Sequence, residues 1–261
     1  MKVIQLILLF LTGISICSFA QKKFTNPELA QQLKEIYNEV AIVATNSSST
    51  YEYVLDESQL RVGHTEDIDL ISLKSNIKYR RSVYYNDHVK VKKSNVKYTS
   101  GKGTLKSDEV CGNYEVDGIF YSDAKVCSYF FDILYEASEV SFSAVTEYDD
   151  PRYFTRVFFH DQDPAVIREI KIIVPDEVEV ELVEMNFDGF DIKKQVREEA
   201  GRKTYQYNLE NLSEFKDEGN SLGITHEYPH LLVLTKSFQV AGNRQIVLSK
   251  VDDLYAWYSG L

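Results

Sequence analysis

The sequence predicts a mainly β protein: a large antiparallel β-sandwich with a short N-terminal helix and a second short helix at the C-terminus. Three observations support this fold class. Apolar and polar residues alternate in many short segments, as in strands with one buried and one solvent-facing side. The chain holds 18 Tyr and 14 Phe, which favour strands. Turn signals separate these segments without intervening helical patterns, which excludes alternating strands and helices.

The start of the chain has the features of a signal peptide. Lys2 is followed by an apolar run over residues 3–11. Ser18 and Ala20 are small residues at the −3 and −1 positions of a cleavage site, so Gln21 should begin the mature protein. The alternative is a membrane anchor, but a spanning helix needs about 20 mainly apolar residues. We therefore expect an exported protein, periplasmic or extracellular, with no transmembrane segment after cleavage.

The composition excludes some partners. The chain carries 29 Lys and Arg against 40 Asp and Glu, a net charge of −11. Binding to nucleic acid or to anionic lipid depends on clustered positive charge, so neither is expected as a partner. Hydrophobic residues make up 44% of the chain, enough for a packed core, and disorder is not expected.

The strongest helical pattern covers residues 25–44. Thr25 and Glu28 form a capping-box pattern, and Pro27 is tolerated in the first turn. Apolar residues then recur at helical spacing. The polar run Asn46–Ser49 has the composition of a turn or linker, after which the period changes to two.

The strand patterns are clearest in five segments. In the segment 77–85, every second residue lies on one face of the strand. That face is apolar or aromatic except for Arg81. The segments with this alternation are 77–85, 89–92, 139–144, 169–174 and 177–182. The predicted organisation is a signal peptide (1–20), an N-terminal helical segment (21–45), a β-sandwich domain (46–250) and a C-terminal segment (251–261).

The sequence His226-Glu227-Tyr228-Pro229-His230 matches the zinc-protease motif H-E-x-x-H. In such proteases the two histidines lie one helical turn apart and bind the metal together. Pro229 disfavours that helix, because it lacks a backbone donor and clashes with the preceding turn. The residues are expected to form a loop that enters a strand, and we predict no metal site.

Two cysteines remain in the mature chain. Cys127 lies in an apolar strand, where a cysteine is usually a small buried hydrophobe rather than a nucleophile. If Ser122 and Asp123 close a tight hairpin, Cys127 faces a residue near Gly118, and Cys111 lies roughly 23 Å away. A disulfide needs Cα atoms within about 7 Å. The sequence therefore favours two free thiols, and a bridge would require the chain to bend before Asn113.

The order of several motifs resembles a known bacterial family. These motifs are 120–125, the Phe-rich 152–159, 168–175, 205–207 and 227–231. Over residues 35–261, their order is similar to that of the uncharacterised β domain that precedes transglutaminase-like domains in exported proteins of Bacteroidetes type. In that family a papain-like domain with a Cys-His-Asp triad follows. The resemblance implies no catalytic residue here, because this chain stops where that domain would begin.

The sequence thus favours an exported, non-catalytic module that binds or positions a protein partner, namely a transglutaminase-like or cysteine-peptidase-like domain. An alternative is an envelope structural or adhesive protein that binds peptide or glycan through exposed Tyr and Phe, and a hydrolase is the least favoured reading. No catalytic residue, cofactor or metal is predicted. The candidate partner contacts are Leu254, Trp257, Tyr258 and Leu261, which a helix would gather on one side.

Overall fold

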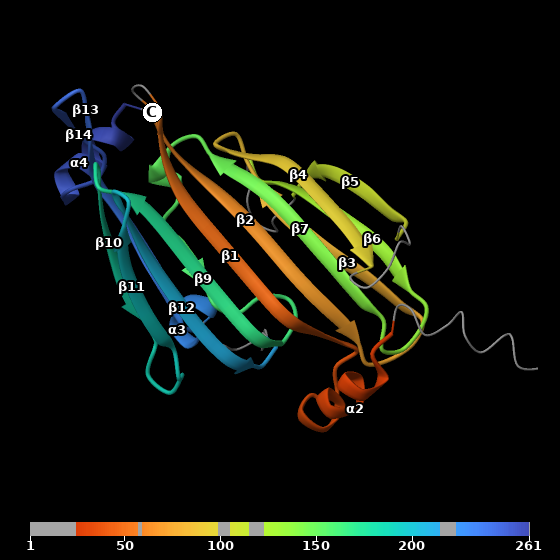
Figure 1. Cartoon of the computed structure of the whole chain (residues 1–261). Coiled ribbons are helices and arrows are strands. Elements are labelled where there is room, and N and C mark those ends of the chain that lie inside the picture. The colour runs from red at the N-terminus through yellow and green to blue at the C-terminus, as the bar shows by residue number, and fades with distance from the viewer. Residues whose placement is uncertain (1–24, 57–58, 99–104, 115–122, 215–222, 261) are drawn as a thin grey trace, which may run out of the picture.

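The computed structural model describes residues 25–56, 59–98, 105–114, 123–214 and 223–260, and the predicted signal peptide and Leu261 lie outside them. The described chain is mainly β, with three sheets and a short helix near each end, which confirms the predicted fold class (Figure 1). No helix in these ranges is both long enough and apolar enough to cross a membrane.

The largest sheet has seven strands and runs along the whole molecule (Figure 1). All neighbours are antiparallel except β1 and β9, which are parallel. The prediction of antiparallel strands therefore holds for every pair of this sheet but one. In spatial order the strands are β11 (Lys193–Glu199), β12 (Arg202–Leu212), β9 (Ala165–Pro175), β1 (Ile42–Asp56), β2 (Gln59–Ser72), β7 (Glu139–Tyr148) and β4 (Val89–Tyr98).

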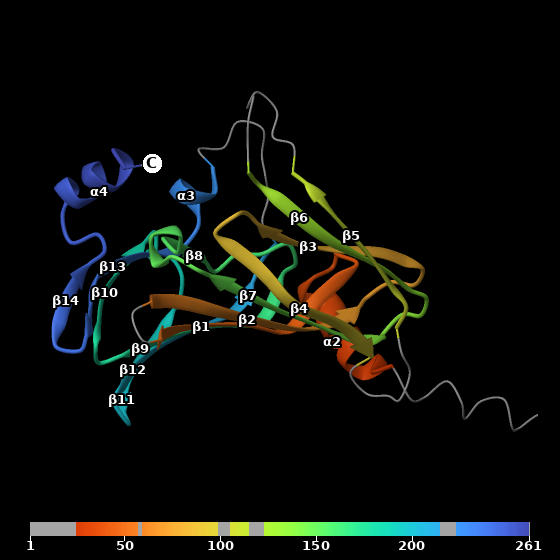
Figure 2. The ribbon, with the colours of Figure 1, turned by 90° about the horizontal axis from the view of Figure 1, so that it is seen from above.

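A three-stranded sheet packs over one end of the large sheet (Figure 2). The packing is visible in the contact of the Tyr129 and Phe142 rings, whose centroids are 5.5 Å apart. In spatial order its strands are β3 (Ile77–Tyr85), β6 (Lys125–Ile133) and β5 (Ser107–Asn113).

A four-stranded sheet covers the other end, on the same face (Figure 2). The Tyr53 hydroxyl on β1 lies 2.7 Å from the Thr235 hydroxyl on β13, which ties the two sheets together. One continuous cluster of buried residues includes side chains from all three sheets, as expected for a sandwich. The strands are β10 (Val178–Met185), β13 (His230–Val240), β14 (Asn243–Ile246) and β8 (Arg156–Phe158).

The N-terminal helix, α2, is shorter than predicted. It spans Pro27–Ile36, and the Asn26 side chain accepts a hydrogen bond from the Leu29 amide at its start. Ala30 and Leu33 belong to a second buried cluster, which lies on the opposite face of the large sheet. The predicted helix end at 44 is wrong, because the chain has already entered β1 at Ile42.

The polar run Asn46–Ser49 is not a linker, because it lies in the middle of β1. Ser47 and Ser49 are each 2% exposed and face the interior. Arg168 donates to the Ser47 hydroxyl at 3.0 Å. A strand with polar residues on its buried face lacks the hydrophobic alternation that reveals strands in a sequence, and this explains the wrong prediction.

Candidate functional site

The two histidines of the H-E-x-x-H match do not share a helical turn. His226 lies in the short helix α3 (Ile224–Glu227), whereas His230 is the first residue of β13. Tyr228 between them is extended, with φ −111° and ψ 146°. His230 is 3% exposed, and its Nδ1 lies 3.0 Å from the Tyr228 carbonyl oxygen. The helical spacing that a zinc protease uses is therefore absent at this motif.

The prediction of free cysteines is wrong. Cys111 on β5 lies directly opposite Cys127 on β6, and the two form a disulfide with a Cα–Cα distance of 4.1 Å. The ladder ends near the Tyr114 amide, which donates to the Ala124 carbonyl at 2.8 Å. The connection between β5 and β6 thus begins earlier than a tight turn at Ser122 and Asp123 would require. The pairing register of the two strands therefore differs from the predicted one, and Cys111 faces Cys127. Ser122 and Gly118 themselves lie outside the described residues.

The one group of potential metal ligands in the described residues includes this bridge. It consists of Glu109, Cys111 and Cys127. Because the two sulfurs are bonded to each other, neither is a thiolate that could bind a metal. This group therefore does not provide a candidate metal centre.

A buried ion network connects the three-stranded sheet to the large sheet. Arg81 on β3 donates two hydrogen bonds to Asp161, at 2.8 Å and 2.6 Å, and a third to Glu66 on β2 at 2.6 Å. Burial by itself would raise the pKa of Asp161, but the Arg81 guanidinium reverses this effect and lowers the pKa to about 2. Burial raises the pKa of Glu66 against the opposing effect of Arg81. One guanidinium thus holds two carboxyl groups in the interior.

A buried histidine lies beside this network. The His64 ring stacks on the Tyr51 ring with a centroid distance of 4.3 Å, and its Nδ1 lies 3.2 Å from the Thr146 hydroxyl. Burial, together with the positive charges of Arg168 and Arg81, lowers the pKa of His64 to about 4. The imidazole is therefore neutral at pH 7.

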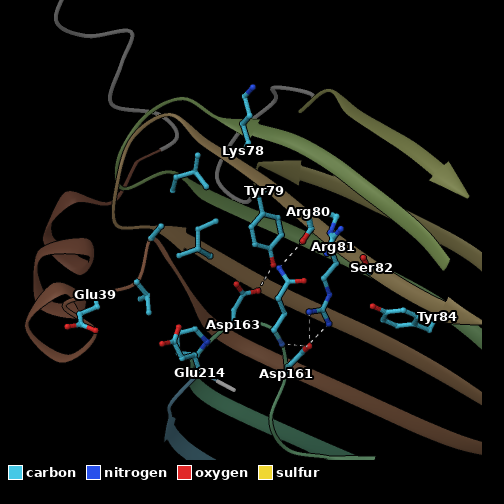
Figure 3. A pocket seen from close by; sticks show the side chains of 16 residues that line it. Glu39, Lys78, Tyr79, Arg80, Arg81, Ser82, Tyr84, Asp161, Asp163 and Glu214 are labelled. Atoms are coloured by element: carbon cyan, nitrogen blue, oxygen red, sulfur yellow. Dashed lines mark hydrogen bonds and ion pairs between the residues drawn. The ribbon is translucent and has the colours of Figure 1, made fainter. Parts of the chain in front are cut away.

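A cavity of about 770 Å³ follows β3 beside the ion network (Figure 3). The Tyr79 hydroxyl donates to the Asp163 carboxylate, and both residues line the cavity. Burial raises the pKa of Asp163 to about 6. The residues that line the cavity come from β3 and from two segments that face it, 39–42 and 161–164, together with Glu214.

Sequence reasoning did not identify this cavity. The available signal was Arg81, a charged residue on the predicted buried face of a strand, which requires a buried counter-charge. Its partners, Glu66 and Asp161, follow no pattern that the sequence displays. Only the pairing of distant segments brings them together.

The C-terminal helix, α4 (Val251–Tyr258), forms as predicted, and it contains no buried residue. Among the predicted contact residues, Trp257 packs on this chain: its ring lies 5.6 Å from that of Tyr153 and 5.4 Å from the Arg152 guanidinium carbon. Leu254 and Tyr258 are 37% and 64% exposed. Two further exposed residues that sequence reasoning did not include are Val251 and Tyr255, at 63% and 67%.

Comparison with known proteins supports the fold. No family model matches the chain, and no curated protein is significantly similar to it in sequence. A solved structure of a putative protease from Parabacteroides distasonis is similar, with a TM-score of 0.53 and 14% identity, over 76% of this chain and 41% of that one. A mutant M1 zinc metallopeptidase from Deinococcus radiodurans aligns with a TM-score of 0.38 and 8% identity, over 79% of this chain and 46% of that one. This chain thus spans less than half the length of either protein, and the first likeness shows a shared β fold.

Proposed function

We propose that the protein is an exported, non-catalytic β module that binds or positions a protein partner, namely a transglutaminase-like or cysteine-peptidase-like domain. The observation that carries this proposal is the apolar surface of α4. Four large apolar side chains of this eight-residue helix are exposed: Val251, Leu254, Tyr255 and Tyr258. Aromatic and aliphatic side chains in such a cluster are typical anchors of protein interfaces.

The attachment of α4 suits such a role. Trp257 contacts Tyr153 and Arg152, which attaches the helix to the body of the protein. Asp253 supports its first turn by accepting hydrogen bonds from the amides of Ser249 and Lys250 at 2.9 Å each. A helix that is held on one side can present its remaining apolar side chains to a partner with little loss of conformational entropy.

The comparison with the Parabacteroides distasonis protein also supports the proposal. That protein is described as a putative protease, and the similar fold covers 41% of its chain. A β module of this kind therefore occurs there within a longer protein. The motif order in the present sequence, which resembles a domain that precedes transglutaminase-like domains, leads to the same partner class.

The arrangement of reactive groups favours binding over catalysis. Arg81 is paired with Glu66 and Asp161 in the interior. The two cysteine sulfurs are joined in a disulfide. Such groups stabilise a fold, whereas a nucleophile needs an adjacent base and access to substrate.

The test is binding of the mature protein to a purified transglutaminase-like domain from the same organism, measured by calorimetry. Replacing Leu254 and Tyr258 together by serine should weaken binding at least about tenfold, as loss of interface anchors does. The melting temperature should remain unchanged, because both side chains are exposed. The control is Ile36→Ser on α2, which removes an apolar residue about as exposed as Tyr258, 61% against 64%, far from α4 and should preserve binding. If the double variant binds as the parent does, or if the parent binds no such domain, the proposal is wrong.

One observation favours the alternative of an envelope protein that binds glycan. Tyr84 and Tyr114 lie near the end of the three-stranded sheet with ring centroids 5.0 Å apart, and they are 57% and 40% exposed. Exposed aromatic rings can stack on sugars and on peptides. Co-sedimentation with insoluble envelope polysaccharide, lost in Tyr84→Ser and retained in the α4 double variant, would favour this alternative.

A further inference from the structure

The strand β3 has an unpaired edge that opens into a cavity. Its nine residues pair with β6 on one side, and no described strand pairs with the other side. Exposed strand edges are normally protected by charges or by short length. The edge strand β11 follows this rule, since five of its seven residues are charged. β3 carries two exposed charges, Lys78 and Arg80, and its free edge borders the cavity of about 770 Å³ described above (Figure 3).

One hydrogen bond shows which backbone groups face the cavity. The Gln162 side chain donates to the Arg80 carbonyl oxygen at 2.8 Å. In an antiparallel strand the N–H and C=O groups of one residue point to the same side, and successive residues alternate. The backbone groups of Lys78, Arg80 and Ser82 therefore face the cavity, whereas those of Tyr79 and Arg81 pair with β6.

The opposite wall of the cavity is held in a fixed position. The Ala44 amide donates to the Pro164 carbonyl at 2.9 Å, which joins the segment 161–164 to β1. Asp161 and Asp163 in that segment bind the inward side chains Arg81 and Tyr79 of β3. The groove between β3 and this wall is thus preformed, which lowers the entropic cost of binding.

Both acidic and basic residues line the groove. Its carboxyl groups come from Glu39, Asp161, Asp163 and Glu214, and its basic groups from Lys78, Arg80 and Arg81. Arg81 neutralises Asp161, but neither Glu39 nor Glu214 has an ion-pair partner in the described part of the chain. The positive side chains of Lys78 and Arg80 are exposed. Because strand side chains alternate, both lie on the face of the small sheet opposite to Tyr79 and Arg81, where Asp132 is the ladder partner of Lys78. The unpaired carboxyl groups of Glu39 and Glu214 are therefore the ones available to a basic peptide.

We propose that this groove binds an extended peptide, which adds as a strand to the free edge of β3 and carries Lys or Arg at alternate positions. Hydrogen bonds to the main-chain groups of Lys78, Arg80 and Ser82 provide the affinity for the peptide. Contacts with every second peptide side chain provide the specificity. The basic side chains face Glu39, Asp163 and Glu214. The net charge of −11 attracts such a peptide over longer distances. This site is independent of the proposed α4 interface.

The probe is a synthetic acetylated octapeptide with lysine at its second, fourth and sixth positions and threonine or valine elsewhere. Hydrogen exchange followed by NMR on the mature protein should show rapid exchange at the amides of Lys78, Arg80 and Ser82. Peptide addition should slow all three, while the already paired amides of Tyr79 and Arg81 change little. N-methylation of one alternate set of peptide amides should abolish binding, and methylation of the other set should not, because only one set faces β3.

Variants of the protein test the two recognition elements separately. Gln162→Ala removes the side chain that occupies the Arg80 carbonyl, so the peptide should bind roughly fivefold more tightly, the value of one net hydrogen bond. The double variant Glu39→Gln with Glu214→Gln should bind more weakly. The matched control is Glu177→Gln in the turn between β9 and β10, which removes one exposed charge away from the groove and should leave affinity unchanged.

Several results would overturn the proposal. Equal affinity for a peptide with glutamate in place of lysine would exclude the charge selection. Protection of the Lys78, Arg80 and Ser82 amides before peptide is added would mean that another part of this chain, or a second copy, already covers the edge, and sedimentation would separate these two cases. Failure of the α4 variants has no bearing on any of these outcomes.

Discussion

Arg81 and Asp161 form a two-point ion pair in which Nη1 lies 2.8 Å from Oδ1 and Nη2 lies 2.6 Å from Oδ2. The pair joins β3 to the segment that leads into β9, and the same guanidinium reaches Glu66 on β2. It therefore fixes the position of the three-stranded sheet on the large sheet. Loss of one member of such a buried pair leaves an uncompensated charge in the interior.

We expect Arg81→Met to destabilise the protein by about 3 kcal/mol, the lower end for a broken buried pair, because Asp161 keeps some exposure. Urea unfolding at pH 7 measures this change. The control is Arg202→Met, which removes an exposed pair with Glu52 and should cost no more than about 1 kcal/mol. Equal losses in the two variants would show that the Arg81 network contributes little to stability.

His160 should make stability depend on pH. It is 5% exposed, neither ring nitrogen has a hydrogen-bond partner in the described residues, and its ring lies 4.2 Å from that of Tyr228. Burial lowers its pKa to about 4. The unfolded chain has a pKa of about 6.5 and binds more protons than the folded protein between pH 6.5 and 4, so stability falls as the pH drops through this range.

We expect His160→Phe to stabilise the protein, because phenylalanine keeps the ring packing and removes two unpartnered polar atoms. The gain should grow between pH 7.5 and 4.5 and reach up to about 3 kcal/mol. Urea unfolding at several pH values provides the measurement. His64 has a pKa lowered in the same direction and should account for a residual slope. If the slope of the variant equals that of the parent, the titration of His160 does not control acid stability.

The disulfide should be essential for the attachment of β5. All seven residues of β5 are exposed, so few side-chain contacts hold this strand to β6. The bridge closes a loop with a sequence separation of 16, for which the chain-entropy account gives about 3 kcal/mol. We expect Cys111→Ala with Cys127→Ala to lose about this amount and to expose the segment 107–113 to proteolysis. Thiol titration of the unfolded, unreduced mature protein should count zero, and a count of two would contradict the bridge.

The H-E-x-x-H residues should not form a zinc site. His226 lies on α3 and His230 begins β13, so their side chains lack the helical spacing of zinc proteases. We expect mature protein purified without an affinity tag to carry no stoichiometric zinc by elemental analysis. His226→Ala should change stability by no more than about 0.5 kcal/mol. Near-equimolar zinc that disappears in this variant would contradict our interpretation.

Much of the secondary structure follows from local patterns in the sequence. The alternation over 77–85 predicts the strand Ile77–Tyr85, and the C-terminal helix forms within the segment 251–261 that the sequence indicates. In these segments the buried face is apolar or aromatic at most positions, so side-chain alternation alone reveals it. The same reasoning fails for Ser47 and Ser49, which are buried but polar. Their partner, Arg168, lies 121 residues away from Ser47.

The sequence by itself determined the fold class, the alternating strands, the C-terminal helix and the position at which a proline breaks the zinc-protease pattern. Only the tertiary structure decided the Cys111–Cys127 bridge, the Arg81 network and the groove along β3. The physical reason is that alternation and helix capping depend on neighbouring residues, whereas register depends on which strands pair and where the ladder begins. A shift of a few residues in the pairing register of β5 and β6 determines whether Cys111 and Cys127 lie opposite each other and form a disulfide or remain free thiols.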